Sequence, residues 1–188
     1  MTTILGLSGS LRRASFNTGL LRAAVGVAPD GVTVKAGSIR GVPLYDADEE
    51  AANGLPETVQ SLQADLKSAD ALLLVTPEYN NGVPGVFKNA LDWMSRGDGL
   101  GYFKGKPVAV IGATPGGFGT ILSQNHWLPV LRTLRTKPWL EGRLLVSRAK
   151  NLFDDDGNLI DEDTRENLRD FLAGFAASLG PTASGASS

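Results

Sequence analysis

Hydroxyl groups, glycines and a pair of arginines are crowded into the segment GLSGSLRRASFN, residues 6–17. Ser8, Ser10 and Ser15 can donate hydrogen bonds, and an arginine supplies a permanently charged guanidinium group. The segment separates a short apolar run from an amphipathic stretch, so these groups would surround a helix N-terminus, where free amides and the helix dipole favour anions. The segment therefore predicts a phosphate-binding loop. The alternative is a capped helix after a flexible turn, with two solvated arginines.

A second segment, PEYNNGVPG, combines a stiff backbone with polar and aromatic groups over residues 77–85. Pro77 and Pro84 restrict the backbone, while two glycines allow a ligand to approach it closely. A planar heterocycle needs such a surface, with backbone donors and acceptors along one edge and an aromatic or apolar wall. The alternative is a turn in which Tyr79 only packs against its neighbours.

The elements that must position these segments alternate between apolar runs of strand length and amphipathic helical stretches. This alternation is typical of a parallel sheet with helices on both faces. The expected strands are residues 4–7, 32–39, 71–76, 108–113 and 143–146, and the expected helices are 17–27, 59–69, 84–95, 119–134 with a break at Pro129, and 161–179. We predict a single doubly wound α/β domain with a five-stranded parallel sheet over residues 1–179, followed by a disordered tail over 180–188.

Ligands of open α/β sheets bind beyond the carboxyl ends of the strands. Three loops of unusual composition leave such ends here: SGSLRRASF after the first strand, PEYNNGVPG after the third and TPGGFG after the fourth. We expect these loops to converge on one site. Two commoner nucleotide motifs do not explain it, because Gly6 and Gly9 have the wrong spacing for G-x-G-x-x-G and GYFKGKP is one residue short of a Walker loop.

Length and composition match one ordinary globular domain and exclude several classes of protein. A net charge of −2 provides no field for holding nucleic acid, so an anion site must be built locally. The absence of cysteine excludes disulfides, thiolate metal sites and cysteine nucleophiles. The longest apolar run is far shorter than the about 20 residues of a membrane span. We expect a cytoplasmic protein without nucleic-acid partner, membrane insertion or metal ion.

Taken together, GSLRRASFN and TPEYNNGVPGVFKNALDW resemble the motifs of the NADPH-dependent FMN reductase family. Members of this family have a flavodoxin-like fold and include flavin, quinone, azo and chromate reductases. The resemblance covers roughly residues 4–177. It implies that the predicted five-stranded sheet is flavodoxin-like and that the anion site holds the phosphate of FMN.

The resemblance also implies a role for each matching residue. The FMN phosphate and ribityl chain would be held by Ser10, Arg12, Ser15, Phe16 and Asn17. The isoalloxazine would be lined by Pro77, Glu78, Tyr79 and Asn80, and its pyrimidine edge would meet Thr114, Gly116 and Gly117. Arg12 occupies the arginine position of the family motif, whereas Arg13 is its neighbour. Gly82 replaces a serine found in many members, and the loop after the fourth strand is rearranged.

The implied activity is transfer of electrons from NADPH or NADH through bound FMN to a small acceptor. A quinone, a flavin, an azo compound or a metal oxyanion would serve, with ping-pong turnover at the flavin N5. No side chain is then required as a catalytic acid, base or nucleophile, and the only histidine, His126, is given no role. Family members are commonly oligomers, which implies a homodimer or homotetramer. The alternative is a flavodoxin-like electron carrier or a flavin-binding sensor; Arg12 and the near-neutral charge favour the reductase.

Overall fold

The apolar runs of the sequence form one parallel sheet whose inner strands are buried on both faces. The strands are β1 (Thr2–Ser8), β2 (Val32–Gly37), β3 (Ala71–Val75), β4 (Pro107–Ala113), β5 (Lys137–Pro138) and β6 (Leu145–Val146). Their order in the sheet is β2-β1-β3-β4-β5, with β6 also pairing with β4. Ile4 of β1 lies opposite Val34 of β2 and Ala71 of β3. This is the strand order of flavodoxin-like folds, as predicted.

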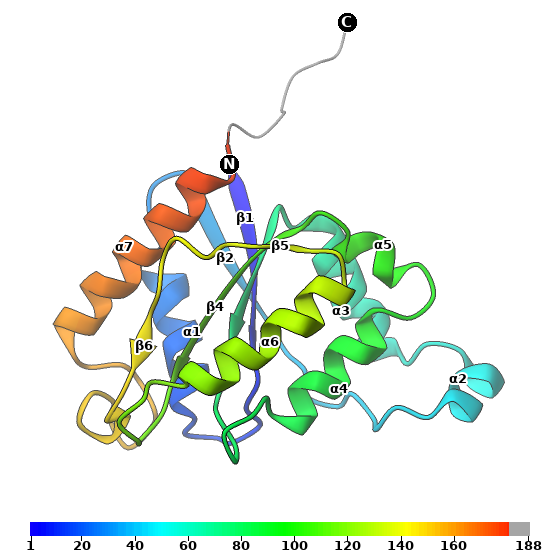
Figure 1. Ribbon diagram of the computed structural model, residues 1–188, viewed down its shortest axis with the longest axis horizontal. Helices are drawn as coiled ribbons and strands as arrows, with labels where there is room; N and C mark the ends of the chain where they lie inside the picture. The colour runs from blue at the N-terminus through cyan, green and yellow to red at the C-terminus, as the bar shows by residue number, and fades with distance from the viewer. Residues whose placement is uncertain (181–188) are drawn as a thin grey trace, which may run out of the picture.

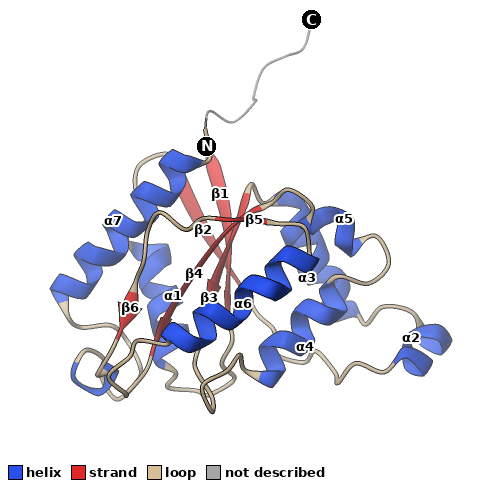
Figure 2. Cartoon of the chain, in the orientation of Figure 1, coloured by secondary structure: helices blue, strands red, loops and turns tan. Residues whose placement is uncertain are grey.

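Helices cover both faces of this sheet in the computed structural model, which describes residues 1–180 (Figure 1, Figure 2). They are α1 (Phe16–Gly26), α2 (Ala47–Asn53), α3 (Glu57–Ser68), α4 (Gly85–Met94), α5 (Gly99–Phe103), α6 (Ile121–Thr133), the 3-10 turn η1 (Ala149–Asn151) and α7 (Glu162–Ser178). The tail predicted over 180–188 lies, apart from Gly180, outside the described residues. No helix within residues 1–180 is long and apolar enough to cross a membrane.

The alternating side chains of each strand divide the core into two layers. Ile4 of β1 packs with α1 and α7 on one face, whereas Leu5 and Leu7 pack with α3, α4 and α6 on the other. Burial on both faces explains why β3 is a continuous apolar run. Gly6 allows α1 to lie directly on the sheet, because a Cβ there would come within 2.3 Å of the Leu21 side chain.

The predicted fifth strand is split into two short pieces, so the sheet has six strands rather than five. β5 pairs with the start of β4 through Pro107 and Val108, and β6 pairs with its end through Gly112 and Ala113. Between the pieces, Trp139 leaves the strand path and packs against the aromatic rings of α7, with centroid distances of 5.0 and 5.4 Å. The N–H groups on either side of Pro138, those of Lys137 and Trp139, donate to the Lys106 and Val108 carbonyls, so Pro138 needs no donor at this edge of the sheet.

Two short helices, α2 and α5, occur where the sequence pattern predicts only connections. In the polar segment 41–56, Asp46 caps α2 by accepting a hydrogen bond from the Asp48 N–H group at 2.9 Å. This helix has no buried residue and extends away from the body of the molecule (Figure 1). A capping residue followed by acidic residues marks the start of this helix, but without an apolar stripe the sequence pattern does not predict it.

Candidate functional site

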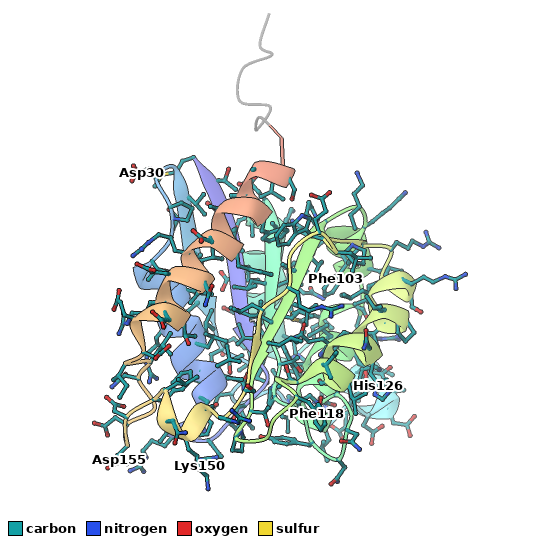
Figure 3. All side chains as sticks on the ribbon, turned by 60° about the vertical axis from the view of Figure 1, so that its left-hand side comes forward. Asp30, Phe103, Phe118, His126, Lys150 and Asp155 are labelled. Carbon is teal, nitrogen blue, oxygen red and sulfur yellow. The ribbon has the colours of Figure 1, made fainter. Side chains whose placement is uncertain are left out.

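A cleft opens beyond the carboxyl ends of β1, β3 and β4, where the three predicted loops meet. Nine of the twelve predicted site residues line it: Ser10, Arg12, Ser15, Phe16, Asn17, Pro77, Glu78, Tyr79 and Thr114. Ala113 and Pro115 also line it and were not predicted. Phe118, His126, Lys150 and Asp155 lie along this edge of the molecule, and Asp30 marks the opposite end (Figure 3).

The remaining predicted residues, Asn80, Gly116 and Gly117, belong to the same loops but do not line the cleft. All three are exposed. The loop after β4 is held from below, because Thr114 N–H donates to the Val146 carbonyl at 2.9 Å and Ala149 N–H donates to the Thr114 carbonyl at 3.0 Å. Thr114 is therefore fixed at the cleft, and the Gly116 carbonyl accepts a hydrogen bond from the Arg148 N–H group of the same supporting segment at 2.8 Å.

One end of the cleft offers hydrogen-bond donors at the N-terminus of α1. Ser15 is the N-cap, and its buried Oγ accepts a hydrogen bond from the Thr18 N–H group at 3.2 Å. The Phe16 and Asn17 N–H groups, which start the helix, have no acceptor within residues 1–180. The first turn carries no acidic residue, so the positive end of the helix dipole is not neutralised.

Arg12 adds a guanidinium group to this end. Its Nη2 donates to the Ala14 carbonyl at 3.3 Å, and the guanidinium carbon lies 5.9 Å from the centre of the Phe16 ring. Arg12 forms no salt bridge with any described residue. Ser10 Oγ accepts from the Arg12 N–H group at 3.4 Å, which leaves the hydroxyl proton of Ser10 available. These donors suit a phosphate group.

The side-chain amide of Asn17 is engaged within the protein. It is buried, and its Nδ2 donates to the Ala113 carbonyl at 2.8 Å while its Oδ1 accepts from the Ala113 N–H group at 2.9 Å. Both ends of the amide are thus used to join α1 to the end of β4. The Asn17 side chain therefore holds two walls of the cleft together, while its backbone N–H group stays without an acceptor within residues 1–180.

Glu78 also acts on the protein itself. Its Oε2 accepts hydrogen bonds from the Leu122 and Ser123 N–H groups at 2.9 and 3.0 Å, at the N-terminus of α6. The residue before this helix, Thr120, has a φ of 65° and its side chain does not cap the helix. Glu78 therefore supplies the cap from a different loop and fixes the position of α6 beside the cleft.

Replacing Glu78 with alanine is expected to lower the free energy of unfolding by about 1–2 kcal/mol, because two helix N–H groups lose their charged acceptor. Urea unfolding of the apoprotein measures this change. Glu78→Gln keeps one acceptor oxygen without the charge and should fall between the alanine variant and the parent. Equal stability of all three proteins would contradict the capping role.

Tyr79 stands at the rim of the cleft on a tight turn. Tyr79 and Gly82 exchange both backbone hydrogen bonds, at 3.0 and 3.2 Å, and Asn80 and Asn81 between them have φ values of 50° and 61°. Asparagine adopts this conformation more readily than most residues, which explains the Asn-Asn pair. Asn80 thus shapes the turn that presents Tyr79, a residue that is 48% exposed.

A buried polar cluster supports the cleft from below and was not predicted. Thr76 Oγ1 donates to the Pro77 carbonyl, accepts from Trp127 Nε1 at 3.0 Å and lies 2.9 Å from Ser123 Oγ. The Trp127 ring packs edge-on against Phe87 at 5.1 Å. The cluster fixes the carboxyl end of β3 against α6. Its members lie 47 and 51 positions from Thr76, so no local pattern could identify it.

Replacing Thr76 with valine keeps the side-chain shape but is expected to cost about 2–3 kcal/mol of stability, since the Trp127 and Ser123 donors become unpaired in the core. The matched control, Ser123→Ala, removes one member and leaves the Thr76–Trp127 bond, so a smaller loss is expected. Thermal or urea unfolding compares the two. A Thr76→Val variant as stable as the parent would show that the cluster does not hold the strand end.

Comparison with known proteins agrees with this fold and site. The family described as NADPH-dependent FMN reductase matches residues 2–151. An NAD(P)H-dependent FMN reductase from Pseudomonas aeruginosa is 41% identical over 169 residues, which are 90% of each chain. A 2-hydroxy-1,4-benzoquinone reductase from Burkholderia sp is 39% identical over 169 residues, covering 90% of this chain and 91% of the relative.

A solved structure is similar over almost the whole length. The flavoenzyme FerB from Paracoccus denitrificans, an NAD(P)H:acceptor oxidoreductase, superposes with a TM-score of 0.83 at 32% identity. The superposition covers 95% of this chain and 97% of FerB. The likeness therefore extends over nearly the whole fold.

Proposed function

Because the chain belongs to the NADPH-dependent FMN reductase family, we propose that it binds FMN in this cleft and passes electrons from NADPH or NADH to a small-molecule acceptor. The observation that carries the proposal is the donor set at one end of the cleft. Free N–H groups of α1, the guanidinium group of Arg12, which forms no salt bridge within residues 1–180, and the Ser10 hydroxyl all belong to residues that line this end, and together they suit a phosphate.

The residues around the cleft fit FMN along its length. We assign the phosphate to Ser10, Arg12 and the backbone of Phe16 and Asn17, with Ser15 fixing the helix start. Pro77 and Tyr79 would form the wall beside the isoalloxazine, and Glu78 would position that wall through α6. Thr114, with Gly116 and Gly117 beyond it, would meet the pyrimidine edge.

Bound FMN would supply the hydride chemistry at its N5, accepting from the nicotinamide and giving to the acceptor on one shared face. The chain contributes binding, orientation and a half-exposed aromatic rim at Tyr79. Sharing one face requires the oxidised nicotinamide to leave before the acceptor enters, so we expect ping-pong turnover. Steady-state rates at several fixed acceptor concentrations should give parallel double-reciprocal lines; intersecting lines would contradict a shared face.

A quinone is the acceptor class that we place first. A relative at 39% identity is named a 2-hydroxy-1,4-benzoquinone reductase, and a second relative at 38% identity from Pseudomonas putida is named a quinone reductase. Free flavin, azo compounds and metal oxyanions are the other candidates. Comparing kcat/KM for 1,4-benzoquinone, free FMN, an azo dye and chromate tests this order, which a higher value for any of the last three would overturn.

The other proposals concern assembly and location. We propose a cytoplasmic homodimer or homotetramer, in keeping with the oligomers common in the family. Trp93 and Met94 are buried within the subunit, whereas Arg96 and Leu100, which follow them, are exposed and could contact a partner subunit. Light scattering of the purified protein measures the assembly, and a mass equal to the 19.8 kDa chain would contradict it.

A further inference from the structure

A second groove lies on the other side of the β1–α1 loop. It has a volume of about 340 Å³ and is formed by three segments: residues 8–13 at the end of β1 and in the loop, residues 18–22 of α1, and residues 36–40 at the end of β2 and beyond it. Ser10 and Arg12 line both this groove and the cleft, so the two adjoin. We call the second one the arginine groove.

Four arginines surround the arginine groove: Arg12, Arg13, Arg22 and Arg40. No acidic residue lines it, and none of the four forms a salt bridge within residues 1–180. The chain as a whole carries a net charge of −2, so this positive charge is a local concentration. Its field favours a multiply charged anion.

Besides Arg12, which also lines the cleft, Arg22 and Arg40 are held in place by hydrogen bonds, and Arg13 makes none with its side chain within residues 1–180. Arg22 Nη2 donates to the Gly157 carbonyl and to Asn158 Oδ1, both at 3.0 Å. Arg40 Nη2 donates to the Leu11 carbonyl at 2.7 Å and so joins the segment after β2 to the β1–α1 loop. The exposed Arg13 side chain has no hydrogen-bond partner in the described part of the chain and is free to bind a ligand.

Neutral donors and an apolar wall complete the groove. Ser38 Oγ accepts a hydrogen bond from the Arg40 N–H group at 3.2 Å, which leaves its hydroxyl proton for a ligand. Leu21 and Ile39 are buried along the wall. The groove therefore combines guanidinium and hydroxyl donors with apolar surface, as a phosphorylated nucleoside requires.

We propose that the arginine groove binds the 2′-phosphate of NADPH, so that the protein discriminates against NADH. This proposal rests on the proposed function, since the nicotinamide must reach the adjoining cleft. Arginine side chains bind a phosphate group through charge-assisted hydrogen bonds, whereas a carboxylate beside the phosphate would repel it. Here Ser38 and Arg40 follow β2, and residues 32–45 contain no aspartate or glutamate.

The first test is kinetic. Arg13→Gln is expected to lower kcat/KM for NADPH about tenfold, the effect of losing one charge-assisted hydrogen bond to phosphate, and to leave kcat/KM for NADH unchanged. Arg40→Gln should act in the same direction. The matched control, Arg132→Gln, removes an arginine from the exposed surface of α6 and should change neither value. Equal losses for both nucleotides, or none, would overturn the proposal.

The second test does not depend on turnover. Calorimetry of the parent protein should show binding of adenosine 2′,5′-bisphosphate, and Arg13→Gln should weaken it about tenfold. Adenosine 5′-monophosphate and inorganic phosphate are the comparison ligands, and equally tight binding of either would mean a general anion site and overturn the proposal. A protein that binds the bisphosphate but neither holds FMN nor oxidises NADPH would refute the proposed function instead. Arg40→Gln is interpreted only if its unfolding midpoint matches that of the parent.

Discussion

Replacing Arg12 with alanine is expected to weaken FMN binding about 100-fold, because the phosphate loses a bidentate charge-assisted donor. The side chain is exposed and makes one hydrogen bond to the described part of the chain, to the Ala14 carbonyl at 3.3 Å. The stability of the apoprotein should therefore hardly change. Quenching of FMN fluorescence on titration with apoprotein measures the affinity, and urea unfolding measures the stability.

The neighbouring arginine is the matched control for this substitution. Arg13→Ala removes the same charge one position away. The Arg13 side chain lines the arginine groove but not the cleft. It should leave the FMN affinity close to that of the parent. Equal weakening by both substitutions would mean that net positive charge holds the phosphate rather than Arg12, and full affinity in Arg12→Ala would remove this residue from the site.

Asn17→Ala is expected to lower the free energy of unfolding of the apoprotein by about 3 kcal/mol, because the Ala113 N–H and carbonyl groups both lose their partner in a buried position. FMN binding should weaken as well, since α1 and the end of β4 form two walls of the cleft. A residue that only contacted the ligand would change the affinity without changing the stability of the apoprotein. Unfolding without FMN separates the two roles.

Two further variants sharpen this result. Asn17→Asp keeps an acceptor for the Ala113 N–H group but faces the Ala113 carbonyl with a carboxylate, so it should also be destabilised. Asn125→Ala changes an exposed asparagine on α6 and should leave stability unchanged. If Asn17→Ala were as stable as Asn125→Ala, the two hydrogen bonds would not hold the junction of α1 and β4.

Much of the fold follows from local pattern. The continuous apolar run of β3 predicts a strand buried on both faces, and the alternation of runs with amphipathic stretches predicts the parallel sheet. The edge of the sheet was less predictable. Trp139 leaves the strand path to pack on α7, which begins more than twenty positions later, and a tertiary contact of this kind leaves no periodic signal.

In the site, the positions of the residues could be predicted better than their roles. The motifs placed nine of twelve residues at the cleft because each motif follows the end of a strand. Roles were harder to predict, since they depend on contacts between distant segments. Asn17 bonds to a residue 96 positions away, and Glu78 caps a helix 44 positions away. One motif can contain both a side chain that is available to a ligand, such as Arg12, and a side chain that bonds only to the protein, such as Asn17.

The visible spectrum of the purified protein with FMN, before and after anaerobic addition of NADPH, tests the central claim most directly. The proposed function predicts a yellow protein that retains FMN through gel filtration and loses its absorbance when NADPH is added. Retention of FMN without reduction by NADPH or NADH would instead indicate the electron carrier or sensor. A colourless protein that takes up no FMN would contradict the assignment of the cleft.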